Sequence, residues 1–295
     1  MTALTDILLP PDQTEGTREA EMGQQPATVT RWRQSIAWLL CLASLPGCRQ
    51  QPAPSTFARP RAVVDLSPVI GEDAPARLMG RKVLKDFGLP ESTTFHHTVS
   101  EAPMYVADSR LELFNHIGPH HDAPNHVIKG GRGTDTFPLD QFIGAAKVLD
   151  FRDRAKDTPL SRADFAGRGL VAGDVVIAYV GYLPPADPND YPSYPYLSGE
   201  AAEYLATLPV RLFATDMPSL AGLKHLAAIM TKGELKGSQA IGPEHYAFLS
   251  RNVPSVEGLV NLDQIVNEPH VVFVGFPLKI KNGNAGPMRA AALVY

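Results

Sequence analysis

Runs of apolar residues, and one segment in which polar and apolar residues alternate, predict a sheet-rich domain in the part of the chain after residue 61. Six segments have the length and the composition of strands: 63–66, 110–115, 145–150, 175–180, 210–214 and 271–280. Residues 110–115 alternate polar and apolar side chains, as expected of a half-buried strand. A turn at residues 283–287 precedes a predicted last strand at residues 288–295.

Fewer segments of the sequence predict helices than predict strands. Residues 76–87 predict a short helix before the turn at Gly88. Ser198 can cap a second helix, whose apolar stripe comprises Ala201, Tyr204, Leu205 and Leu208. Residues 181–196 hold five prolines and four tyrosines, so they predict an irregular loop. One interpretation of this loop is a substrate lid or an oligomer contact, and the other is a plain surface excursion.

The start of the chain has the order of a signal peptide. Arg31 and Arg33 precede an apolar run at residues 36–45, which ends in Leu-Pro-Gly-Cys. This end resembles a bacterial lipobox and predicts a leader at 1–47, a lipid anchor at Cys48 and a tether at 48–61 before a domain at 62–295. The predicted location is therefore the bacterial cell envelope, periplasmic and lipid-anchored, and the alternative is cytoplasmic. An ordinary core helix is the other interpretation of the run, which has about half the roughly 20 residues of a membrane span.

Composition narrows the possible functions. The chain is 44% hydrophobic, has a net charge of −4 and lacks a sustained basic face, so it predicts a globular protein that does not bind nucleic acid. Both cysteines, Cys41 and Cys48, lie before the predicted domain, which leaves the domain without a disulfide framework or a thiol nucleophile. The sequence contains neither a Gly-x-Ser-x-Gly nucleophile elbow nor a phosphate-binding loop. Serine catalysis and nucleotide use are thus disfavoured.

Four of the nine histidines and one aspartate fall within residues 115–126. His116 and His120 have the spacing of ligands on one helix face, but Gly118 and Pro119 lie between them and favour a loop. With Asp122 they offer two imidazoles and a carboxylate, a set that suits Zn²⁺, Mn²⁺ or Fe²⁺. Three protein ligands leave a position open for water.

Two further histidines complete this segment. His126 follows the last of the three candidate ligands and could act beside the open position as a general acid or base. His121 lies between two candidate ligands, so on extended backbone its side chain points the other way. We therefore predict that His121 is a surface or supporting residue.

The segment His-Ile-Gly-Pro-His-His-Asp-Ala-Pro-Asn-His at 116–126 resembles the signature of the metal-dependent cyclase-like hydrolases, which include kynurenine formamidase and isatin hydrolase. It departs from that signature at Pro119, where the family has Thr or Ala. Residues 215–219 and the closing hairpin are also similar to the family. The resemblance covers about residues 63–294 and implies an α/β single domain with a mixed, barrel-like sheet core and flanking helices, the cyclase-like swivelling β/β/α fold.

The resemblance also implies a second set of ligands. The family places a histidine and, twelve residues later, a glutamate as further ligands of a second metal, and His245 and Glu257 match that spacing. Asp122 would bridge the two metals. From the residues alone, Glu257 is a helix-cap or surface residue. Asp216 could be a turn-forming residue and receives no catalytic role, and we expect His225 and residues 232–237 to be solvated.

The implied activity is hydrolysis of a C–N bond in a formamide or cyclic amide, arylformamidase-like or isatin hydrolase-like, by water activated on one or two Zn or Mn ions. The implied partners are a small amide, imide or lactone substrate and further copies of the chain in a homo-oligomer. Two alternatives remain: a metal- or solute-binding envelope lipoprotein without turnover, and a cyclase or lactonase. An enzyme needs His126, and a binding protein does not.

Overall fold

The structure is a computed structural model that describes residues 58–101, 103–231 and 242–295. Every element below belongs to one compact unit, residues 56–295. The predicted signal peptide and most of the tether lie outside the described residues and stay predictions, as does the solvated segment at 232–237. Within the described ranges, no helix is long and apolar enough to cross a bilayer.

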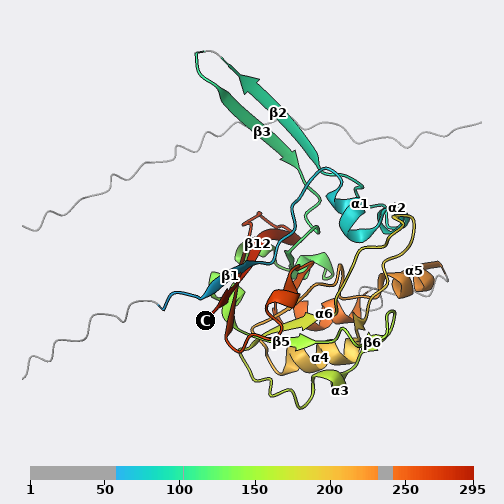
Figure 1. Ribbon diagram of the computed structural model, residues 1–295. Coiled ribbons are helices and arrows are strands. Elements are labelled where there is room, and N and C mark those ends of the chain that lie inside the picture. The colour runs from blue at the N-terminus through green and yellow to red at the C-terminus, as the bar shows by residue number, and fades with distance from the viewer. Residues whose placement is uncertain (1–57, 102, 232–241) are drawn as a thin grey trace, which may run out of the picture. The chain divides into compact units, whose positions relative to one another are not determined.

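The main sheet is mixed and closes on itself (Figure 1). Its last strand pairs with the preceding strand at residues 288–294 and with the fourth strand in the chain at residues 285–287, which closes a ring of seven strands. The eighth strand, the first in the chain, pairs only with the last. In spatial order the strands are β1 (Ala62–Asp65), β12 (Ala285–Val294), β11 (Val271–Pro277), β5 (Ile143–Asp150), β7 (Val175–Tyr179), β9 (Leu212–Thr215), β10 (Ser255–Glu257) and β4 (His120–Asp122). The prediction of a mixed, barrel-like sheet is confirmed.

The apolar strands have two buried faces. On β7, Val175 and Ile177 pack inside the barrel, whereas Val176 and Ala178 pack against the helices. A strand alternates its side chains between the two faces of the sheet, so a continuous apolar run is what a strand with both faces covered requires. This accounts for the unbroken run that the sequence shows at residues 175–180.

Helices cover the outer face of the sheet: α1 (Ala74–Met79), α2 (Arg81–Asp86), α3 (Arg162–Phe165), α4 (Gly199–Thr207), α5 (Leu223–Thr231) and α6 (Pro243–Leu249). The Ser198 hydroxyl accepts a hydrogen bond from the Ala201 amide, so the predicted cap of α4 is confirmed. The single helix expected at 76–87 is wrong. It is divided into α1 and α2 at Gly80, whose φ of +87° is incompatible with a continuous right-handed helix.

A separate two-stranded ribbon is formed by β2 (Thr94–Ser100) and β3 (Val106–Glu112) (Figure 1). All of its residues are exposed except Phe95, which is half-buried. The prediction of a half-buried strand at 110–115 is therefore wrong, because the chain leaves the ribbon after Glu112 and the ribbon covers no core. Alternation identified a strand here but did not show whether one face was buried.

Several connections complete the fold. The last strand begins at Ala285 rather than at residue 288, because residues 285–287 pair with β4 and are not part of a turn. Residues 181–195 are irregular, as predicted, and lead into β8 (Tyr196–Leu197), which pairs with β6 (Pro159–Leu160). Short 3₁₀ helices are present at Pro124–His126, Thr134–Thr136, Leu139–Phe142 and Leu262–Gln264.

Candidate metal centre

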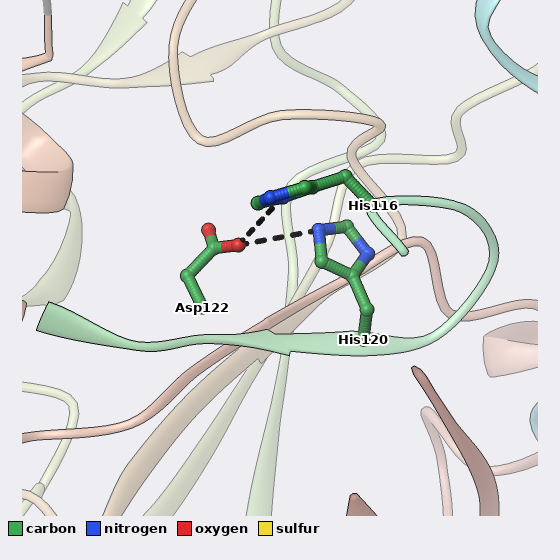
Figure 2. Close-up of side chains that lie close together, drawn as sticks. All are labelled: His116, His120 and Asp122. Carbon is green, nitrogen blue, oxygen red and sulfur yellow. Dashed lines mark ion pairs between the residues drawn. The ribbon is translucent and has the colours of Figure 1, made fainter. Parts of the chain in front are cut away.

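The candidate site lies on the outer face of two neighbouring barrel strands. In the antiparallel pair of β4 and β10, His120 is opposite Glu257 and Asp122 is opposite Ser255. Because side chains alternate along a strand, His120, Asp122 and Glu257 point to the same face. Figure 2 shows His120 and Asp122 side by side on β4, with His116 reaching toward Asp122 from the loop that precedes the strand.

That loop needs glycine at two positions. Gly118 has φ of +62°, and its carbonyl accepts a hydrogen bond from His120 Nδ1 at 2.9 Å. Gly258, directly after β10, lies so close that a Cβ atom there would approach the Gly118 oxygen to 2.6 Å. The loop thus fixes the His120 ring and leaves Nε2 facing the carboxylates. Residues 116–126 form no α-helix, as predicted, but the expectation of a loop throughout is wrong, because residues 120–122 pair with both β10 and β12 and residues 124–126 form a 3₁₀ helix.

Contacts among the side chains define two groups that share Asp122. Asp122 Oδ1 lies 3.0 Å from His116 Nδ1 and 3.4 Å from His120 Nε2. On the other side, His245 Nε2 from α6 lies 2.9 Å from Glu257 Oε1 and 3.6 Å from Asp122 Oδ2. In each group of three residues the donor atoms lie within 4.8 Å of one another. The structure therefore brings together the five predicted ligands from segments more than a hundred residues apart.

The donor atoms are arranged to accept a cation. Both Asp122 oxygens and His120 Nε2 are buried and lack a hydrogen bond of good geometry. Burial opposes a charge on His120, but Asp122 and Glu257 outweigh it and raise the pKa of His120 to about 9. The pKa of His245 is raised in the same way by its neighbouring carboxylates, against its burial. The carboxylates thus require positive charge, which protons on histidine or a divalent cation can supply, so this set of residues fits a divalent metal ion.

His126 lies beside these ligands. It ends the 3₁₀ helix that follows β4, and its ring centroid is 4.4 Å from that of His116 and 5.9 Å from that of His245. The residue is exposed on one side. Desolvation by the surrounding protein atoms lowers the pKa of His126 to about 4 and outweighs the negative charges of Asp122 and Glu257, which act to raise it. The imidazole is therefore neutral at pH 7 and can accept a proton.

Comparisons with known proteins agree with this geometry. The family model described as "Putative cyclase" matches residues 54–221. The chain belongs to this family. The kynurenine formamidase of Salinibacter ruber is 32% identical over 184 residues, which cover 61% of this chain and 76% of that protein. The isatin hydrolase of Roseibium aggregatum is 25% identical over 252 residues, 79% of this chain and 91% of that protein. The resemblance seen in the sequence is confirmed.

Solved structures show the same fold. Isatin hydrolase A from Labrenzia aggregata, bound to benzyl benzoate, aligns with a TM-score of 0.62 at 22% identity and covers 79% of this chain and 93% of that chain. A structure described as a potential metal-dependent hydrolase with cyclase activity aligns with a TM-score of 0.57 at 22% identity, over 78% and 96% of the two chains. The closed sheet described above is therefore the fold of this cyclase family.

His121 points away from the ligands, as predicted, but its predicted surface or supporting position is wrong. It is fully buried inside the barrel, where its ring packs edge-on against Phe137 and Phe142 at centroid distances of 4.5 and 5.0 Å. Burial lowers the pKa of His121 to about 4. The barrel is closed, so the inner face of β4 is core rather than surface, and the local pattern could not indicate this.

The sequence analysis did not predict the roles of three groups near the site. Glu244 is buried beside His245, with Oε1 3.4 Å from His245 Nδ1, and only its place next to a candidate ligand hinted at this. The Leu220 amide donates to Glu257 Oε1 at 2.7 Å, which holds the carboxylate in place. Asp216 is not a simple turn residue: it is buried and accepts hydrogen bonds from the Val180 and Tyr182 amides at 2.9 and 2.8 Å. Burial raises the pKa of Asp216 to about 6.

A cavity of about 630 Å³ opens beside the candidate ligands. His116 and His120 contribute to its wall, and so do Tyr182 and Leu183 from the irregular loop at 181–196. The volume is in the range of sites for small organic molecules. His225 lies elsewhere, exposed and stacked on Tyr196, in agreement with its predicted solvation.

Proposed function

We propose that this member of the cyclase family is a metal-dependent hydrolase that cleaves the C–N bond of a formamide or cyclic amide. The observation that carries the proposal is the pair of three-residue donor groups joined through Asp122, with His126 beside them and an organic-sized cavity opening at His116 and His120. Relatives named kynurenine formamidase and isatin hydrolase support the choice of amide substrates.

We assign His116, His120 and Asp122 to one metal position, and Asp122, His245 and Glu257 to the other. Mixed nitrogen and oxygen donors favour Zn²⁺ or Mn²⁺ over the all-oxygen sites of Ca²⁺ and Mg²⁺. Such an ion would polarise the amide carbonyl and lower the pKa of a water molecule toward about 7. The Leu220 amide and the Gly118 carbonyl hold Glu257 and His120 in fixed orientations, so the donors need little rearrangement on binding.

His126 is assigned the role of general base and then general acid. Its neutral imidazole can take a proton from the attacking water and return it to the leaving nitrogen. Its ring packs against that of His116 at an interplanar angle of 39°, belongs to neither donor group and is open to solvent on one side, so it is free to exchange protons. In this mechanism the donor side chains would hold the metal in position, and His126 would transfer the proton.

Two measurements on the purified protein test the proposal together: metal analysis, and turnover of a panel of formamides, isatin-like imides and lactones. We expect bound Zn or Mn and hydrolysis of at least one formamide or imide. Bound metal without turnover of any panel member would instead identify a metal- or solute-binding protein. Turnover of lactones alone, or formation of product without uptake of water, would assign the site to a lactonase or a cyclase.

We further propose that the protein works as a homo-oligomer in the bacterial cell envelope, anchored through a lipid on Cys48. The exposed β2–β3 ribbon supports an oligomer, because isolated two-stranded ribbons are marginally stable and exposed edges favour pairing. The order of charge, apolar run and cysteine at residues 31–48 supports the anchor. Light scattering tests the first proposal. Lipid labelling of wild type against Cys48→Ser tests the second.

A further inference from the structure

A row of cations follows β5 along one wall of the cavity. Arg152, Arg154 and Lys156 occupy alternate positions and all line the cavity, whereas Asp153 and Asp157 do not. Asp157 is instead engaged by Lys224 and Ser193. This short stretch consists of turns and a bend at residues 152–157, and it presents its three positive side chains to the cavity while both aspartates stay outside the lining. We call Arg152, Arg154 and Lys156 the basic wall.

Ion pairs hold the two arginines of the basic wall in place, but N–H donors of all three side chains remain available. Arg152 uses Nε and one terminal nitrogen on Asp150, and Arg154 pairs with Asp164. A guanidinium carries five N–H donors, so each arginine keeps donors for another acceptor. Lys156 makes no ion pair or hydrogen bond within the described part of the chain, and its ammonium is exposed.

The rest of the cavity lining has a different character. Apolar and aromatic surface comes from Leu78 and Met79 of α1 and from Tyr182 and Leu183. Two histidines of the candidate metal centre, His116 and His120, form a further part of the wall. Two carboxylates also face the cavity. Asp216 already accepts two backbone N–H groups, and Asp263 is exposed. The cavity thus combines ligands for a metal, an apolar surface and a row of cations.

We infer that the substrate is an amide that carries an anionic group, such as a carboxylate, which the basic wall binds while the amide lies at the metal centre. This inference rests on the proposed function and names its substrate class. An apolar body would fill the space beside Leu78 and Tyr182. Arg154 and Lys156 would bind the anion, and the pairing of Arg152 with Asp150 would keep that end of the wall rigid.

The test compares matched substrates: the ortho, meta and para formamidobenzoates, and the corresponding neutral formamidobenzamides. The readout is the ratio of kcat/KM for acid over amide, in wild type, Lys156→Met, Lys156→Glu and the control Lys279→Met, an exposed lysine outside the cavity lining. We expect wild type to prefer the acid for at least one isomer. The ratio should fall about threefold in Lys156→Met and roughly tenfold in Lys156→Glu, mainly through KM, and should also fall as NaCl is raised.

An acid-to-amide ratio that is the same in Lys156→Glu and in wild type would overturn the inference while leaving the proposed function intact. If neither substrate series is hydrolysed, the panel of formamides, imides and lactones decides the proposed function, and equilibrium binding decides the inference separately. In that case calorimetry of the formamidobenzoates on the metal-loaded protein must show weaker binding to Lys156→Glu than to wild type. Equal binding, or no binding to either protein, would overturn the inference.

Discussion

His120 and His121 are consecutive residues on β4 with opposite surroundings. His120 faces Asp122 and Glu257 on the outer side of the strand, and the carboxylates raise its pKa to about 9 in spite of burial. His121 faces the barrel interior, where burial against Phe137 and Phe142 lowers its pKa to about 4. The same side chain is therefore prepared for a cation on one face of the strand and serves as a neutral core residue on the other. Closure of the sheet buries the inner face that holds His121, whereas the outer face that holds His120 also carries Asp122 and Glu257.

The largest expected effect comes from removing the negative charge of Asp122 on the outer face of β4. Asp122→Asn keeps the shape of the side chain but removes the carboxylate shared by both donor groups. We expect loss of bound metal and a fall in kcat/KM on the order of a thousandfold, because metal activation contributes several kcal/mol. Metal analysis and kinetics measure both effects, with the exposed Asp140→Asn as the control. A variant that keeps its metal content would show that Asp122 is not the shared ligand.

Substitution of His126 should separate binding from chemistry. His126→Ala removes an imidazole that contacts His116 but belongs to neither donor group. We expect unchanged metal content and a loss of turnover of about 10²- to 10⁴-fold, the usual contribution of a general acid or base. Turnover within a few-fold of wild type would exclude the proton-transfer role.

In the metal-free protein, the contributions of His120 and His121 to the free energy of unfolding should depend on pH in opposite directions. The pKa of His121 is lowered from 6.5 to about 4, so its contribution is present above pH 6.5 and is lost as the pH falls from 6.5 toward 4. The size of that loss is about 3 kcal/mol. The pKa of His120 is raised to about 9, so its contribution is present below pH 6.5 and is lost as the pH rises from 6.5 through 9.

Denaturant unfolding of the metal-free wild type, His120→Phe and His121→Phe at several pH values checks these signs. His121→Phe should weaken the acid-side loss, and His120→Phe should weaken the alkaline-side loss. If either variant altered the opposite side, the assignment of the two rings to the two faces of β4 would be wrong.

The smallest effect is expected from His121→Phe at pH 7.5. A third aromatic ring beside Phe137 and Phe142 replaces the imidazole, and the hydrogen-bonding contact that is lost, from Nδ1 to the Ser255 carbonyl, is long at 3.4 Å. We expect the free energy of unfolding to change by less than about 1.5 kcal/mol, as for other near-isosteric core changes. Metal content and kcat/KM should stay within twofold of wild type, which distinguishes this position from its neighbour on the strand.

The sequence by itself determined the chemistry of the site and the main strands. The spacing of His116, His120 and Asp122 identified a metal-binding segment without any structure, because so many potential ligands within a few residues have no common structural role. The apolar runs at 175–180 and 210–214 located β7 and β9, because a strand buried on both faces must be apolar throughout, and the run at 145–150 located the more exposed β5. The helix cap at Ser198 could also be predicted from the sequence, because a cap depends only on the residues next to it.

Only the tertiary structure decided how these parts act together. The pairing of β4 with β10 and β12 turned an expected loop into a strand, because a three-residue strand depends on its partners rather than on its own pattern. The same pairing placed Glu257 opposite His120, and the packing of α6 brought His245 to 2.9 Å from that glutamate. Closure of the barrel made His121 a core residue and left the β2–β3 ribbon outside. Burial and charge come from contacts between distant segments, and those contacts are absent from any local stretch of sequence.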